Sequence, residues 1–151
     1  MTQSTTSVMP PSTMLALLHL ASPALPVGGF AYSQGLESAI DEGRVHDTAS
    51  AQCWIDDLLT LVIARFEAPV WLRVHAAALA GDEAAVNRWN RELLATRESA
   101  ELRAESLQMG LSLLRVFPAL QLSVPPLPAP TYTAAFAIAC ARLGIARDEG
   151  L

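Results

Sequence analysis

A serine within a short run of small and aromatic residues is the first place where this sequence could support catalysis. Ser33 lies in residues 31–35 (AYSQG), a degenerate nucleophile elbow, the motif that exposes a serine on a sharp strand-to-helix turn. The motif needs a preceding strand and a histidine that accepts the serine proton. Here proline and glycine precede it, and no histidine follows His75. We therefore expect Ser33 to cap or pack in the first turn of a helix, and keep a small serine hydrolase as an alternative.

Three glycines near this serine could form a loop that cradles a phosphate. They are Gly28, Gly29 and Gly35. A P-loop follows its glycines with a lysine that neutralises the phosphates, whereas all ten basic residues of this chain are arginine. We expect no nucleotide binding or hydrolysis by the chain alone, and interpret the glycines as turns and points of close backbone approach.

Soft-metal ligands are few and scattered along the chain. The candidates are His19, His46, His75, Cys53 and Cys140, and no two of them are four residues apart. Metal-binding pairs on a helix need that spacing, so we predict no high-affinity site within one chain, no resident cofactor and reduced, unpaired thiols. A site shared between subunits leaves no spacing signature and stays open.

A charged stretch from Arg97 to Glu105 is the most informative polar feature. Its carboxylates recur at helical spacing, and they are Glu98, Glu101 and Glu105. The helix dipole favours acids near a helix N-terminus, although like charges one turn apart repel each other. With Arg97 and Arg103 alongside, the stretch forms either a recognition surface for a cationic patch on a partner or an ion-pair network between helices.

Composition excludes several classes of protein. The 151-residue chain has a net charge of −5 and lacks clustered cations, so we expect no nucleic acid binding. Hydrophobic residues make up 52% of the chain, more than one small core needs, which indicates contact with a partner subunit. Residues 116–141 are uncharged, but five prolines interrupt them. No membrane helix is therefore predicted, and the cytoplasm is the expected location.

Hydrophobic periodicity predicts an all-α fold, a single-domain bundle of about seven helices. The expected helices cover residues 13–21, 32–42, 48–66, 69–80, 98–116 and 133–143, with a further helix after residue 82. Ser12, either Asp47 or Thr48, and Asp82 are expected as N-caps. Pro69 is expected as the first residue of a separate helix, which ends at Gly81.

Ser106 and Gly110 lie one turn apart on the helix expected over residues 98–116. Because both residues are small, we expect another helix to approach closely there.

Two segments together resemble the UreF family of urease accessory proteins. Residues 22–37 (SPALPVGGFAYSQGLE) are similar to its N-terminal signature, and residues 97–110 (RESAELRAESLQMG) look like its second signature at the expected separation. We divide the chain into a flexible segment, residues 1–11, and a UreF-like helical domain, residues 12–151. Family members are usually longer, so we expect the C-terminal part of the family domain to be missing.

The resemblance implies a homodimeric scaffold without catalytic activity of its own. Its implied partners are UreD (called UreH in some species), the GTPase UreG and apo-urease, and its implied role is to support GTP-dependent nickel insertion and to modulate UreG. A direct nickel carrier is a further alternative. The resemblance implies the following interface or signature residues: Phe30, Tyr32, Ser33, Gly35 and Glu37 in the first segment, and Arg97, Glu98, Glu101, Arg103 and Glu105 in the second.

Overall fold

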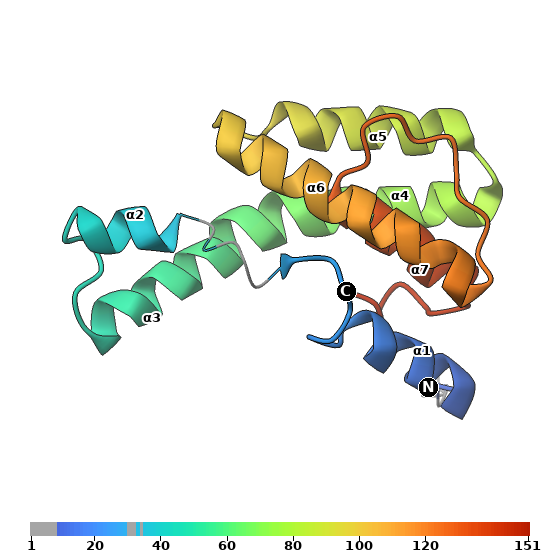
Figure 1. Cartoon of the computed structure of the whole chain (residues 1–151), viewed down its shortest axis with the longest axis horizontal. Coiled ribbons are helices and arrows are strands. Elements are labelled where there is room, and N and C mark those ends of the chain that lie inside the picture. Colours follow the sequence, from blue (N-terminus) through green and yellow to red (C-terminus); the bar gives the residue numbers. More distant parts are fainter. Residues whose placement is uncertain (1–8, 30–32, 34) are drawn as a thin grey trace, which may run out of the picture.

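The computed structural model describes residues 9–29, 33 and 35–151, and all its regular elements are helices (Figure 1). In chain order they are α1 (Pro11–Leu20), α2 (Leu36–Asp41), α3 (Thr48–Asp57), the π-helix η2 (Leu58–Glu67), α4 (Ala68–Ala80), α5 (Glu83–Ala95), α6 (Ala100–Val116), the 3-10 helix η3 (Phe117–Leu120) and α7 (Tyr132–Arg142). The described residues contain no strand, so the predicted all-α fold is confirmed. None of the described helices combines the length and apolar character needed to cross a membrane.

One continuous helical rod runs from Thr48 to Ala80 and combines α3, η2 and α4 (Figure 1). The predicted helix over residues 69–80 is present as α4, which starts one residue earlier and has Pro69 in its first turn, but it continues from η2 and is not separate from it. The turns before this proline adopt the wider π spacing, and the Ala68 amide donates to the Ile63 carbonyl five residues earlier. A widened turn relieves the clash that a proline ring makes with the carbonyl of the preceding turn, so the helix continues through it.

The core lies between α4, α6 and α7. Val74, Leu113 and Ile138, one from each of these helices, expose at most 1% of their surface. Helix α7 is buried on nearly every side, and its many alanines let the neighbouring helices come close. In contrast, α2 and α3 extend away from this body (Figure 1). We call α2, α3 and the adjoining η2 the arm.

A proline-rich connector, residues 121–131, runs from η3 to α7 and is fastened to α5. The side chain of Asn90 donates from Nδ2 to the Ala129 carbonyl at 2.7 Å, and its Oδ1 accepts the Thr131 amide at 2.9 Å. Thr131 in turn is the N-cap of α7. The entry of the chain into α7 is thus held by a single buried asparagine.

Most of the predicted helix ends are present in the structure. Asp47 and Asp82 cap α3 and α5, each accepting a backbone N–H with its side chain. Gly81 ends α4 with a φ of 68°. Ser12 is not a cap, because α1 begins one residue earlier at Pro11, where the N–H that proline lacks would be unpaired in any case.

Two predictions near the N-terminus fall partly outside the described residues. Of the flexible segment predicted over residues 1–11, only residues 9–11 are described, and Pro11 is already helical. The helix predicted over residues 32–42 begins at Leu36, because Gly35 before it has a φ of 83°. A residue in the left-handed conformation cannot belong to a right-handed helix.

Candidate interaction surface

The arm exposes a row of large apolar side chains. Ile55, Leu59 and Ile63 follow one another at four-residue steps and so lie on one side of the rod. Each exposes between 38% and 51% of its surface. No residue of α3 or η2 is buried. An apolar stripe on a helix with no buried side marks a surface for contact with a partner; we call these three residues the apolar row.

Gly35 of the first signature segment lies beside Trp54 of α3. Gly35 precedes α2, and a β-carbon added there would meet the indole of Trp54 at 3.7 Å, an ordinary contact. The positive φ, rather than a lack of space, therefore favours glycine. Arg44 places its guanidinium carbon 5.4 Å from the centroid of the same indole.

The other residues of this signature are placed unevenly. Phe30 and Tyr32 lie outside the described residues. Glu37 is exposed in the first turn of α2. Ser33 is half-buried and its carbonyl accepts the Leu36 amide at 3.0 Å, so it precedes α2 and does not lie in its first turn as expected. The described residues before it form no strand, so they do not provide the context that a nucleophile elbow requires.

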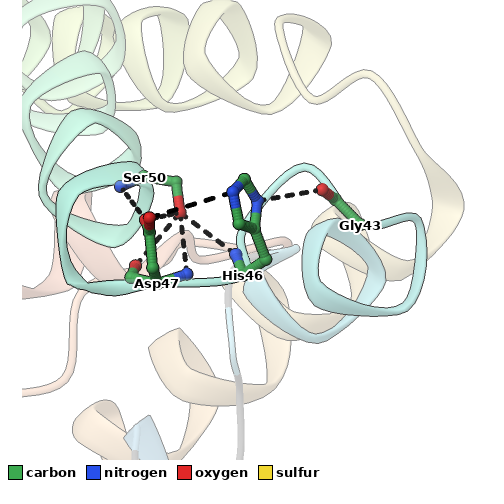
Figure 2. Close-up of polar contacts among 4 residues, drawn as sticks. All are labelled: Gly43, His46, Asp47 and Ser50. Atoms are coloured by element: carbon green, nitrogen blue, oxygen red, sulfur yellow. Dashed lines mark hydrogen bonds and ion pairs between the residues drawn. The ribbon is translucent and has the colours of Figure 1, made fainter.

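A second group of Ser, His and Asp side chains lies at the start of α3 (Figure 2). Ser50 Oγ lies 2.6 Å from Asp47 Oδ1, while the His46 ring lies 3.2 Å from the Gly43 carbonyl oxygen and 3.9 Å from Asp47 Oδ2. A catalytic serine would donate to the histidine, whereas here the hydroxyl is bonded to the aspartate. We therefore interpret this group as a structural cap.

The hydrogen bonds at this position form a capping box. Asp47 Oδ1 accepts the Ser50 amide at 2.8 Å, and Ser50 Oγ accepts the Asp47 amide at 3.0 Å. The Ser50 hydroxyl, followed by the Ser50 amide, lowers the pKa of Asp47. Of the two residues predicted as this cap, Asp47 and Thr48, Asp47 is the N-cap. The prediction missed Ser50, although a capping residue three positions after an N-cap is a recognisable signal.

Part of the charged stretch faces solvent at the start of α6. Ser99 caps this helix by accepting the Leu102 amide at 3.1 Å. Glu101 is exposed in the first turn, where its own backbone N–H and the Ser99 hydroxyl lower its pKa. Glu98 and Arg103 are exposed as well. These charged side chains are accessible to a partner.

Arg97 instead joins an ion-pair network inside the molecule. Its Nη2 donates to Glu67 Oε1 at 2.8 Å, and the two side chains expose only 16% and 25% of their surface. Thr133 Oγ1 donates to Glu67 Oε2 at 2.7 Å. The network connects the end of η2, the segment before α6 and the first turn of α7. It places the start of α6 at the base of the arm (Figure 1).

Glu105 lies half-buried on α6 beside this network. Burial raises its pKa, the Arg97 charge opposes that rise, and the Glu67 charge adds to it. Of the residues in the charged stretch, Arg97 and Glu105 thus belong with the interior, whereas Glu98, Glu101 and Arg103 face outward.

We expect Glu105→Gln to raise the melting temperature at neutral pH and to change it little in acid. The folded state raises the pKa of Glu105, so the wild type loses stability as the pH rises through that raised pKa. Glutamine removes this loss. Thermal unfolding at pH values on either side of the usual glutamate pKa measures the difference.

The exposed Glu101 supplies the control for this prediction. Its pKa is lowered in the folded state, so its ionisation stabilises the protein at neutral pH and that contribution is lost in acid. Glu101→Gln should therefore lower the melting temperature at neutral pH, the opposite trend. A pH-independent effect of Glu105→Gln would contradict the prediction.

The structure gives the possible metal ligands ordinary environments. The described residues hold no group of three or more His, Cys, Asp or Glu side chains placed to bind a metal ion. Burial raises the pKa of Cys140 to about 12, so its thiol stays protonated. His75 stacks on Trp71, and its Nε2 lies 2.9 Å from the Ile145 carbonyl oxygen, the geometry of a donating N–H.

Comparison with known proteins identifies the family. The UreF family model matches residues 45–151. The urease accessory protein UreF of Cupriavidus necator is 49% identical over 148 residues, which cover 91% of this chain and 63% of that protein. UreF of Delftia acidovorans is 59% identical over 100 residues, 66% of this chain and 42% of that protein. The bifunctional urease accessory protein UreEF of Bordetella bronchiseptica is 47% identical over an alignment of 161 residues, which covers 99% of this chain and 37% of that protein.

These relatives are all named as urease accessory proteins, and the part of the chain that the family model matches includes the second signature segment, residues 97–110. The chain belongs to the UreF family. It spans less than two thirds of the length of these relatives.

Proposed function

We propose that this chain is a non-catalytic scaffold in a complex with UreD (UreH) and UreG that supports GTP-dependent nickel insertion into apo-urease. In this proposal GTP is hydrolysed on UreG, and the scaffold modulates that GTPase. The protein acts in the cytoplasm as a homodimer. Family membership supports the proposal, and the name of the Bordetella relative, UreEF, joins UreF to a second urease accessory function in one protein.

The apolar row of the arm is the observation that carries this proposal. Its three side chains lie on a rod segment without a single buried residue, so the described part of the chain leaves them exposed. The Arg97–Glu67 ion pair holds the start of α6 at the base of the same arm. The exposed charges of Glu98, Glu101 and Arg103 therefore lie toward one end of the apolar surface. An apolar centre with a charged rim is the usual composition of a protein interface.

We expect the wild-type chain to co-elute with UreD and UreG in size-exclusion chromatography, and Leu59→Asp/Ile63→Asp to abolish this complex. A buried carboxylate without a partner is strongly unfavourable in an apolar interface. Both side chains are exposed, so the melting temperature of the variant should stay close to that of the wild type.

The control variant is Thr60→Asp/Ala64→Asp, which adds the same charges with the same four-residue spacing at exposed positions of η2, about 100° around the helix from the apolar row. It should still form the complex. If the wild type fails to bind UreD and UreG, the scaffold proposal is wrong. If both double variants bind equally well, the apolar row is not the contact surface.

A further inference from the structure

Two arginines form cation–π contacts with one tryptophan on the surface of α4 and α5. The guanidinium carbons of Arg73 and Arg88 each lie 4.9 Å from the centroid of the Trp89 ring. Both arginines are exposed, whereas Trp89 is half-buried and packs against the core. The two guanidinium carbons are therefore at most twice that distance apart, and both lie against a ring that packs on the core.

No carboxylate of the described structure neutralises this pair of charges. The ion pairs among the described residues are Arg44–Glu42, His46–Asp47 and Arg97–Glu67. Glu92 is one turn beyond Arg88 on α5 but forms no ion pair with it. Arg73 instead donates from Nη1 to the Pro69 carbonyl at 2.9 Å, which orients its guanidinium beside the ring. Two like charges at one ring repel each other, and an anion bound beside them offsets that repulsion.

We propose that Arg73, Trp89 and Arg88 form a docking site for an acidic segment of a partner protein. Guanidinium groups bind carboxylates through paired N–H donors, and a neighbouring indole provides a rigid contact area. Arginine and tryptophan are also the residues most enriched among the energetically dominant positions of protein interfaces. The net charge of −5 opposes the long polyanion of a nucleic acid but allows a short acidic segment to bind locally.

This site differs from the apolar row in position and in the partner chemistry that it fits. It lies on the α4–α5 pair, whereas the apolar row lies on α3 and η2. The inference therefore does not depend on the UreD and UreG assignment, and each can fail without the other.

The test is fluorescence anisotropy with a labelled oligoglutamate peptide at low ionic strength. We expect the full chain to bind this probe, and Arg73→Ala/Arg88→Ala to bind it about tenfold more weakly. Arg65→Ala/Arg115→Ala removes the same charge from exposed arginines that take part in no ion pair of the described structure, and it should bind like the wild type. Added salt should weaken wild-type binding, because the contact is between exposed charges.

A further variant separates the tryptophan from the charges. Trp89→Leu keeps both arginines but removes the platform, so it should also weaken binding while the circular dichroism spectrum stays helical. Equal affinities for the two arginine double variants would show that net charge alone is responsible and would overturn the proposal. Tighter binding of tripolyphosphate than of oligoglutamate would overturn the assignment to an acidic protein segment.

Discussion

Gly110→Ala is expected to lower the free energy of unfolding by about 3 kcal/mol, although alanine is the better helix former. Gly110 is buried in α6, where the connector passes over it. A β-carbon at this position would lie 2.7 Å from the carbonyl carbon of Thr131 and closer still to the carbonyl oxygen of Pro130. Backbone atoms cannot rotate away as a side chain would, so α6 and the connector must separate.

Urea unfolding followed by circular dichroism measures this loss as a lower midpoint at similar slope. Gln108→Ala, exposed on the same helix, is the control and should change stability by less than about 0.5 kcal/mol. If Gly110→Ala is as stable as the wild type, the connector can move away from α6 without cost, and the close contact is not needed for stability.

At Gly110 the sequence predicted the close contact but not the segment that makes it. Two small residues one turn apart, Ser106 and Gly110, predicted a close approach at this point of α6, and a close approach is present. The expected neighbour was another helix, whereas the observed one is the backbone of Pro130 and Thr131 before α7. The spacing of small residues along one helix shows where another segment can approach closely, but it does not show which distant segment does so.

Helix ends were predictable because the interactions that form them are local. Asp47 and Asp82 bind amides three residues ahead, and Gly81 adopts its positive φ without any distant contact. The continuous rod through Pro69 was not predictable in this way. The widened turns that accommodate the proline have no residue signature of their own.

The charged stretch shows a different limit. Helical spacing predicted three carboxylates along one helix, but α6 begins at Ala100, so Glu98 precedes it and only Glu101 and Glu105 lie on it. The spacing also could not show which of them faces solvent. Arg97 points inward because its partner, Glu67, lies 30 residues away on η2, and Thr133 completes the network from a third element. The exposure of the apolar row could not be predicted either, because an apolar stripe on a helix normally indicates contact with the core of the same chain.

Asn90→Ala is expected to cost about 4 kcal/mol of unfolding free energy, more than Gly110→Ala. Asn90 is only 2% exposed. Its Nδ2 donates to the Ala129 carbonyl at 2.7 Å, and its Oδ1 accepts both the amide and the hydroxyl of Thr131 at 2.9 Å. Alanine leaves the Ala129 carbonyl and the Thr131 amide without this partner, removes one of the two hydrogen bonds of the Thr131 hydroxyl, and creates a cavity as well.

Asn87→Ala is the matched control, one turn earlier on α5. The Asn87 side chain is half-buried and donates to the Pro126 carbonyl at 3.2 Å, so it also fastens the connector, but near solvent. Its loss should cost about 1 kcal/mol or less, because water can replace the bond. Urea unfolding of both variants provides the comparison. Equal losses would mean that the connector is held along its whole length and not chiefly at Asn90.

We expect the Asn90 substitution also to weaken binding at the proposed interface. Thr131 caps α7, and Thr133 in the first turn of α7 donates to Glu67 at the base of the arm. Loosening the start of α7 therefore weakens the network that positions η2 and the start of α6. We expect Asn90→Ala to bind UreD and UreG more weakly even where circular dichroism still shows a folded protein, whereas Asn87→Ala should bind like the wild type. Unchanged binding by folded Asn90→Ala would show that the arm keeps its position without this anchor.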